Sequence, residues 1–202
     1  IKYNSTGTVQ WTARYDNGLE DISYNITVDK DDNVIISGSC TRGYNSGTRD
    51  YSLTTTIYNS DGTTGGTVSG NDDNETAVII IKYNPGGFVQ WVVFIDRELD
   101  ADYDYGQGVV TDSKGNVYSV GNHNANSATY FYNRDANIGF TLPDPGSTHG
   151  RDVFVVKYNA NGYLEWVVNI GRGGSAADEG YGITVDENDY IYVTGFYNAN
   201  VG

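Results

Sequence analysis

The sequence predicts an all-β fold made of repeated four-stranded antiparallel sheets, and three observations lead to this prediction. Apolar residues occur in short runs of strand length, separated by clusters of Gly, Asn, Asp and Ser. Only 19% of the residues are charged and 26 are glycine, a composition that suits short strands and many turns. The chain also matches itself when shifted by about 80 residues, so it consists of similar structural units.

Two segments recur in step along the chain. The first places a tryptophan nine positions after the lysine of a Lys-Tyr-Asn sequence, and it occurs as Ile1–Trp11, Ile81–Trp91 and Val156–Trp166. The second places a glycine nine positions after an aspartate, and it occurs as Ile26–Gly38, Val109–Gly121 and Ile183–Gly195. The lysines are 80 and 75 residues apart, so each period is one unit with loops of varying length.

Each segment is predicted to be a β-hairpin, because apolar residues flank turn formers such as Asn84–Gly87 and Asp112–Asn116. Two hairpins give each unit four strands. The runs Val78–Ile81 and Val153–Val156 are apolar at consecutive positions, which indicates strands that are buried on both faces. Sheets stacked face to face around an axis have this pattern, so the units are predicted to be β-propeller blades.

These residues resemble the β-propeller repeats of bacteria and archaea. That repeat couples a Tyr-Gly-Ile-x-Val-Asp strand, a Gly-Asn turn, a Tyr-Val-Thr-Gly strand and a Lys-Tyr-Asn-x-x-Gly-x-x-x-Trp hairpin. The clearest copy is Tyr181–Asp186 followed by Tyr192–Gly195, and the resemblance extends over all three units. Members of the family are mostly uncharacterised surface or secreted proteins, so the resemblance implies a propeller fold and an extracellular or cell-surface location.

The whole chain, residues 1–202, is predicted to be one repeat domain. It divides into a half blade at 1–16, blades at 17–98 and 99–172, and a half blade at 173–202. Between the second and third strands of a unit, Cys40–Glu75 and Asn122–Arg151 are longer than a simple connection. Inserted hairpins are predicted there, since strand-like runs flank turn formers: Tyr51–Ile57 precedes Asn59–Gly62, and Ala128–Tyr132 precedes Ile138–Leu142. Specificity is expected to lie in these insertions.

Charge and cysteine content exclude several classes of protein. The net charge of −14 would repel nucleic acid and anionic membranes. Cys40 is the sole cysteine, so no intrachain disulfide forms and no zinc-site spacing exists. No apolar run approaches 18 residues, so no membrane span is expected. The chain opens at Ile1 within the repeat pattern, which indicates a mature or trimmed form of something longer.

Aromatic residues recur at two repeat positions. Tryptophan occupies one of them and tyrosine the other: Trp11, Trp91 and Trp166; Tyr3, Tyr83 and Tyr158. A sugar-stacking platform is one interpretation. Packing between blades is the favoured one, because a residue needed in every unit fills the same site each time.

Carboxylates also recur at one position, eight residues before the aspartate of the second segment. These are Asp21, Asp104 and Asp178, with Glu20, Asp102 and Glu179 beside them. Hard oxygen ligands at this density make the three aspartates candidate calcium ligands, although the twelve-residue calcium loop is not reproduced. The favoured alternative is that they cap turns through backbone N–H groups. No other cofactor is expected.

Catalytic residues are not indicated, and the chain is predicted not to be an enzyme. His123 and His149 lie in unrelated contexts, and Ser147 has no nucleophile signature around it. The leading functional hypothesis is therefore an extracellular structural or interaction protein. The alternative is a carbohydrate-binding, lectin-like propeller whose partners are glycans.

The predicted partners are copies of the chain itself. It begins with a third-and-fourth-strand hairpin, Ile1–Arg14, and ends with a first-and-second-strand hairpin, Ile183–Gly195, so two ends could form a composite blade. Three blades are too few for a closed propeller, which typically has four to eight. Self-assembly is therefore expected, into a two-fold ring of six blades or into a filament. The rival interpretation is that the chain is a part of a longer propeller.

Overall fold

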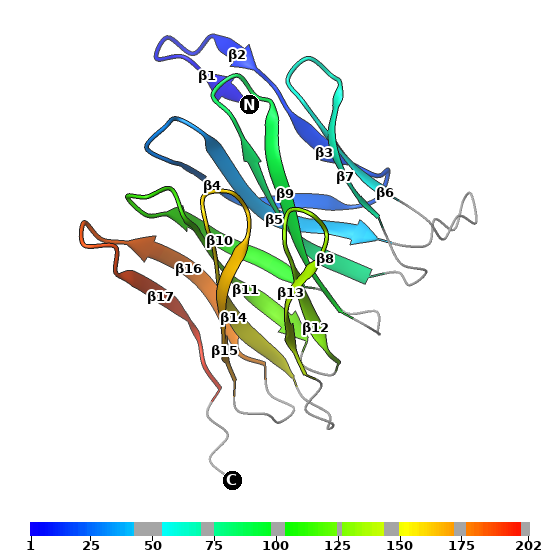
Figure 1. Cartoon of the computed structure of the whole chain (residues 1–202), viewed down its shortest axis with the longest axis vertical. Coiled ribbons are helices and arrows are strands. Elements are labelled where there is room, and N and C mark those ends of the chain that lie inside the picture. Colours follow the sequence, from blue (N-terminus) through cyan, green and yellow to red (C-terminus); the bar gives the residue numbers. More distant parts are fainter. Residues whose placement is uncertain are drawn as a thin grey trace.

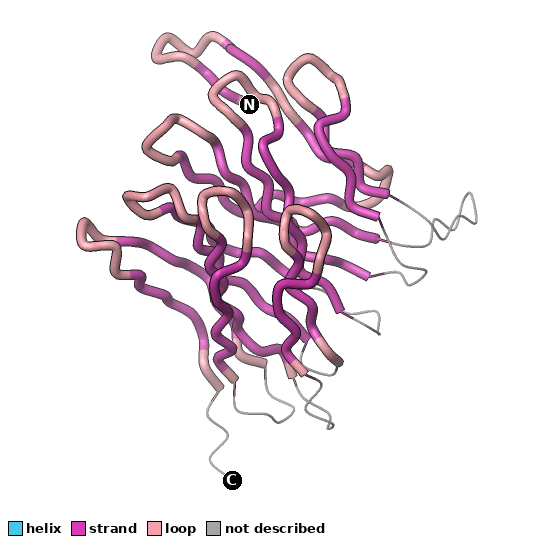
Figure 2. The backbone as a smooth tube through the Cα atoms, viewed as in Figure 1, coloured by secondary structure: helices cyan, strands magenta, loops and turns pink. Residues whose placement is uncertain are grey.

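The computed structural model describes residues 1–42, 54–69, 75–97, 104–124, 127–143, 150–171 and 177–198. Within these ranges every regular element is a β-strand (Figures 1 and 2). The strands are β1 (Lys2–Tyr3), β2 (Val9–Trp11), β3 (Arg14–Asp16), β4 (Asp21–Val28), β5 (Val34–Arg42), β6 (Thr54–Tyr58), β7 (Thr64–Ser69), β8 (Glu75–Tyr83), β9 (Val89–Arg97), β10 (Tyr105–Thr111), β11 (Val117–Asn124), β12 (Thr129–Tyr132), β13 (Ile138–Leu142), β14 (Arg151–Tyr158), β15 (Leu164–Ile170), β16 (Glu179–Val185) and β17 (Ile191–Phe196).

Two complete blades stand in the middle of the molecule. One has the strand order β4-β5-β8-β9 and the other β10-β11-β14-β15, and every neighbouring pair is antiparallel. At the ends, β1–β2 and β16–β17 form two-stranded sheets. Figure 1 shows the sheets fanned out side by side, with β1–β3 at one end of the fan and β17 at the other. The predicted all-β fold of propeller-like blades is confirmed.

The turn between the first two strands of each unit is set by its aspartate. Asp29, Asp112 and Asp186 each accept hydrogen bonds through Oδ1 from the backbone N–H groups two and four positions later, at 2.9–3.0 Å. The third residue after each aspartate has a positive φ of 60–79°: Asp32, Gly115 and Asp189. Asp and Gly tolerate this left-handed conformation, so the local sequence is sufficient to specify the turn.

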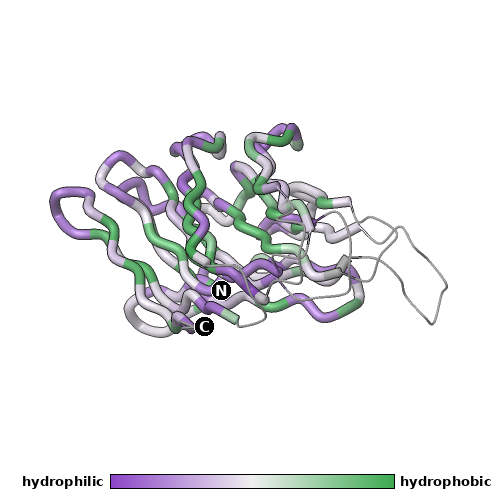
Figure 3. The backbone as a smooth tube through the Cα atoms, turned by 90° about the horizontal axis from the view of Figure 1, so that it is seen from below, coloured by the Kyte–Doolittle hydropathy of each residue, from purple (hydrophilic) through white to green (hydrophobic). Residues whose placement is uncertain are grey.

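The core lies between the blades rather than within a sandwich. Ile79 and Ile81 of β8 belong to a buried cluster with Ile57, whereas Val78 and Ile80 of the same strand belong to another with Phe131. Alternate residues of β8 thus face opposite neighbours, which confirms that the consecutive apolar run is buried on both faces. Figure 3 shows apolar residues along the strands and hydrophilic residues in the turns.

The inserted hairpins are present as β6–β7 and β12–β13, and residues 51–53 of the first prediction lie outside the described ranges. Each hairpin pairs with the outer strand of the preceding unit rather than with its own unit. β6 pairs with β3 and β12 pairs with β9, which extends those sheets to three and six strands. Their turns return to their own units: Asn59 accepts from Val89 N–H and Asn133 from Leu164 N–H, both at 2.8 Å.

The hairpins therefore act as straps between neighbouring blades.

No helix in the described part of the chain is long and apolar enough to cross a membrane.

Candidate interaction surfaces

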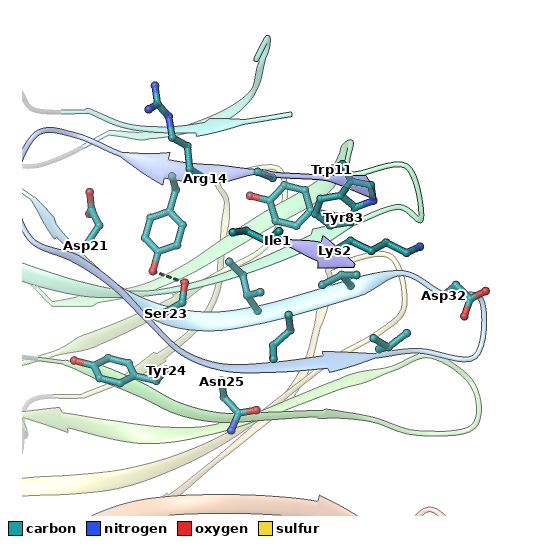
Figure 4. A pocket seen from close by; sticks show the side chains of 16 residues that line it. Ile1, Lys2, Trp11, Arg14, Asp21, Ser23, Tyr24, Asn25, Asp32 and Tyr83 are labelled. Carbon is teal, nitrogen blue, oxygen red and sulfur yellow. Dashed lines mark hydrogen bonds between the residues drawn. The ribbon is translucent and has the colours of Figure 1, made fainter. Parts of the chain in front are cut away.

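A groove of about 690 Å³ opens between β1–β3 and β4 (Figure 4). Ile1, Trp11 and Tyr15 line one wall, and Ile26 and Val28 of β4 line the other. In each complete blade the third strand pairs with a second strand, as β8 does with β5 and β14 with β11. β1 stands at the third-strand position, and in the described structure its one strand partner is β2. The groove is thus the place where the inner two strands of a blade would lie.

Ile1 and Ile26 in this groove are exposed, although their counterparts in the next unit, Ile81 and Val109, are buried. Ile26 is 61% exposed, whereas Val109, three residues before the next repeated aspartate, is 2% exposed. Val28 and Ile1 are 54% and 65% exposed. Exposed apolar patches are often interaction surfaces in proteins.

The other end of the fan is a two-stranded sheet, β16–β17. β16–β17 are the first and second strands of a unit, and no third strand pairs with β17 in the described part. Tyr192 is 55% exposed, whereas its counterpart Tyr118 is 5% exposed. Both hydroxyls donate to the turn aspartate of their own unit at 2.9 Å. β16–β17 therefore already have the internal arrangement of a blade's inner half.

The repeated tryptophans join successive units. Trp11 Nε1 donates to the Pro85 carbonyl at 2.9 Å, and Trp91 Nε1 donates to the Ala160 carbonyl at 3.1 Å. A Cβ at Gly87 would lie 2.8 Å from the Trp11 ring, and one at Gly162 would lie 2.9 Å from the Trp91 ring. Packing between blades is thus confirmed for two tryptophans, and the glycine in the next turn is what lets the ring approach.

The repeated tyrosines are also internal where two units flank them. Tyr83 and Tyr158 are 3% and 0% exposed, and burial raises the pKa of each phenol. Tyr3, beside the groove, is 55% exposed. Two of the three rings at this position are therefore closed to a bound sugar.

The three candidate calcium ligands lie at the start of the first strand of each unit, opposite the end of the second. Asp104 accepts from Asn124 N–H at 3.1 Å and pairs with Arg97 Nε at 3.1 Å, both side chains being buried. Asp178 accepts from Asn198 N–H at 2.8 Å. Asp21 accepts from Asn17 N–H at 3.0 Å.

Their neighbours add little to a calcium site. Glu179 Oε1 lies 3.5 Å from Arg151 Nη1, so this carboxylate is paired with a cation. Asp102 lies outside the described residues. Within the described ranges no three His, Cys, Asp or Glu side chains come together as a metal site would require. Calcium binding stays a prediction. A bound ion would stabilise the native state, so excess chelator should then lower the melting temperature.

Acidic pH is expected to stabilise the fold through Asp21. Burial raises the pKa of this carboxyl to about 6, against the lowering effect of the Asn17 and Thr41 backbone groups. An unfolded aspartate titrates near pH 3.9, so between about pH 4 and 6 the folded chain binds more protons than the unfolded chain. The free energy of unfolding should therefore rise as the pH falls through this window.

Asp21→Asn is expected to reduce this pH dependence, because an amide cannot titrate but can still accept from Asn17 N–H. Urea denaturation of both proteins at pH 4.5 and 7.5 measures the difference. Parallel changes in the two proteins would contradict the assignment.

His123 has a structural environment. Its Nδ1 lies 2.9 Å from Thr129 Oγ1 and its Nε2 lies 2.8 Å from Asn169 Oδ1, and burial lowers the pKa of the imidazole. Both ring nitrogens are thus engaged by a hydroxyl and an amide, as in a buried structural histidine. His149 and Ser147 lie outside the described residues.

Comparisons with known proteins agree with this architecture. A family model described as a β-propeller repeat matches residues 165–195, which run from β15 to β17. The chain is also 29% identical over 205 residues to an uncharacterized WD repeat-containing protein of Acanthamoeba polyphaga mimivirus. The match covers 99% of this chain and 14% of the viral protein, so the chain spans a small part of that relative's length. Together with the blades, the matches support a propeller repeat family, whose repeat domain suggests a protein-interaction module.

Proposed function

We propose that this chain is a non-enzymatic structural and interaction module that works outside the cell and joins copies of itself. The joint is a composite blade, in which β16–β17 of one copy supply the inner strands and β1–β3 of the next supply the outer strands. The observation that carries the proposal is the groove between β1–β3 and β4, which has the place and the apolar lining that an inner strand pair needs.

The internal repeats give the register of this joint. Val34 pairs with Tyr83 and Ile35 with Lys82, as Val117 pairs with Tyr158 and Tyr118 with Lys157. The same register places Ile191 opposite Tyr3 and Tyr192 opposite Lys2 of the next copy. Lys157 Nζ lies 5.4 Å from the centre of the Tyr118 ring, so Lys2 is expected to make the same cation–π contact with Tyr192.

Trp166 provides the second contact. It holds the repeat position of Trp11 and Trp91 and is half-buried, whereas Trp91 is 4% exposed. The glycine that would receive it is Gly7, which has a φ of +80° and open space where a Cβ would stand, with nothing within 4 Å of that point. Across the joint, the Trp166 ring would pack on Gly7 and Nε1 would donate to the Ser5 carbonyl, as seen for the other two tryptophans.

Charge opposes the joint at its exposed turn. Ser113 donates to Asp189 of the next unit through its N–H and hydroxyl, at 2.9 and 2.8 Å. Across the joint, Glu187 of one copy has the repeat position of Ser113, and Asp32 of the next copy has the repeat position of Asp189. Two carboxylates would face each other there, and each copy carries a net charge of −14. Association is therefore best measured at an ionic strength of about 0.15 M or above, where the Debye length is about 8 Å or less.

Light scattering at micromolar concentration tests the proposal. We expect a mass of about twice 22.0 kDa for a closed ring, or a polydisperse series for a filament. Trp166→Ala should weaken association about 30-fold or more, the effect of losing a tryptophan hot spot. Tyr163→Ala, on the same hairpin and 42% exposed, is the matched control and should associate normally.

A folded monomer in the parent protein would overturn the proposal. Glycan binding, the alternative from the sequence, has less support because Trp11 and Trp91 and two of the repeated tyrosines are engaged between units. Binding of a glycan to the monomer would favour that alternative if the Trp11→Ala variant no longer bound the glycan.

A further inference from the structure

Three buried polar side chains of the first complete blade meet at the turn between β4 and β5. Lys82 of β8 pairs with Ile35 of β5, so it lies diagonally across the sheet from Asn33, two residues before Ile35. Asp29 begins the same turn. Lys82, Asp29 and Asn33 are 3%, 6% and 7% exposed. An amine, a carboxylate and a carboxamide are thus held together away from water.

Asp29 joins the other two side chains. Its Oδ2 lies 2.8 Å from Lys82 Nζ and accepts a hydrogen bond from Asn33 Nδ2 at 2.9 Å. Gln90 Nε2 donates to Asn33 Oδ1 at 3.1 Å. The lysine nitrogen and the carboxamide nitrogen therefore share one carboxylate oxygen, and the oxygen of the carboxamide has a hydrogen-bond donor of its own.

The surroundings of Lys82 are apolar. Its pairing partners on the two neighbouring strands are Ile35 and Trp91, which are 0% and 4% exposed. Both belong to the buried cluster between the two complete blades. Burial away from water makes a charge costly, so these surroundings reduce the free-energy difference between the ion pair and its neutral form.

The corresponding residues of the next unit make different contacts. Asn116 Nδ2 again donates to the turn aspartate, Asp112, at 2.7 Å. Tyr118 replaces the isoleucine of the first blade, and its hydroxyl donates to the same Asp112 oxygen at 2.9 Å. Lys157 is paired with Glu165 instead, at 2.7 Å. The tyrosine therefore takes the place that the lysine has in the first blade, and this second set is an internal control.

We propose that Lys82 and Asn33 form an intramolecular amide bond, with Asp29 as the proton carrier. Asp29 takes a proton from Lys82, and the neutral Nζ attacks the carbonyl carbon of Asn33. A bond forms between that carbon and Nζ, and its bond to Nδ2 breaks as Asp29 donates the proton to Nδ2. Asp29 then takes a second proton from Nζ, and the released ammonia carries it away as ammonium. No oxidant or other reactant is needed.

The contacts of the cluster suit each of these roles. Asp29 touches both nitrogens between which the proton passes. The hydrogen bond from Gln90 stabilises the negative charge that develops on Asn33 Oδ1 during the attack, as the donors of an oxyanion hole do. The folded sheet holds the amine beside the carboxamide, which replaces an encounter in solution by a reaction within one molecule.

The ion pair is the resting form of the cluster. Burial acts to raise the pKa of Asp29, but hydrogen bonds from Lys82 and Asn33 hold this pKa below its usual value. The neutral amine is therefore a minor species, and the bond is expected to form slowly and once in each molecule. It joins the first turn of the blade to its third strand within one copy, so it does not depend on the composite blade.

Mass spectrometry of the purified full chain tests the proposal. After incubation at neutral pH until the mass is constant, we expect a mass lower than that of the sequence by one ammonia. Trypsin should then release residues 31–42 joined to residues 50–97, because a lysine within an amide bond is not cleaved. This joined pair distinguishes the proposed bond from cyclisation of an asparagine, which also releases ammonia.

Two arginine variants provide the controls. Lys82→Arg keeps a positive charge beside Asp29, but a guanidinium is always protonated and does not attack the carboxamide. This variant should give no joined peptides. Lys157→Arg makes the same change at the internal control position and should give the joined peptides as the parent does. A parent chain without the joined peptides would overturn the proposal, and so would joined peptides in Lys82→Arg.

Discussion

Trp91→Ala is expected to lower the free energy of unfolding by about 3–5 kcal/mol, the usual cost of truncating a buried tryptophan. Trp91 is 4% exposed and belongs to the cluster between the two complete blades. Its ring packs on Gly162, and its Nε1 donates to the Ala160 carbonyl at 3.1 Å. The alanine variant would lose the buried surface and leave this carbonyl without its donor. Urea denaturation with a fitted m value measures the change.

Trp166→Ala is the matched control for this loss. Trp166 has the same repeat position, but in one copy it is half-buried, and within the described residues no turn of a following outer hairpin lies against its ring. Its truncation should cost the isolated chain less than about half as much, because much of its surface is already in water. Equal losses for the two variants would show that the tryptophan stabilises its own hairpin and not the contact between blades.

The sequence was sufficient to predict the blades because the same packing problem recurs in each unit. Asp29, Asp112 and Asp186 specify their turns by local hydrogen bonds, which a short segment encodes by itself. The apolar runs in β8 and β14 showed burial on both faces, since a half-exposed strand would alternate. Each of these sequence patterns lies within about ten residues of the turn or strand that it predicts.

The straps could be predicted only in part. The hairpins can be predicted from local sequence. The strand that each hairpin pairs with is more than 30 residues away, and main-chain hydrogen bonds do not depend on which side chains the two strands carry. The shared Tyr-Asn-x-Asp at Tyr58 and Tyr132 was the signal available for it. The pairing of Asp104 with Arg97 was also missed. Arg172 has the repeat position of Arg97, six residues after the tryptophan, so the repeated arginine was the signal available for this pairing.

The fifth residue of the second strand is a glycine in every unit, because the facing first strand comes too close for a side chain. A Cβ at Gly38, Gly121 or Gly195 would lie 2.1 Å from a carbonyl oxygen of the facing first strand. The register of each first strand shifts just before this point, as a β-bulge does, so the two backbones approach closely. The clash is with backbone, which cannot rotate away as a side chain can.

Gly121→Ala is therefore expected to destabilise the chain by about 3 kcal/mol or more, at the upper end of the range for overpacking. Besides the Tyr105 carbonyl, the new methyl group would lie 2.5 Å from Phe154 Cζ, and Phe154 is fully buried. Gly66→Ala in β7 is the matched control, because its methyl group would meet only Val92 Cγ2, at 3.3 Å. Thermal and urea denaturation of both variants should show a large loss for the first and a small change for the second. A Gly121→Ala protein as stable as the control would mean that β10 can move away from β11, and that the glycine is not needed for the close approach of the two strands.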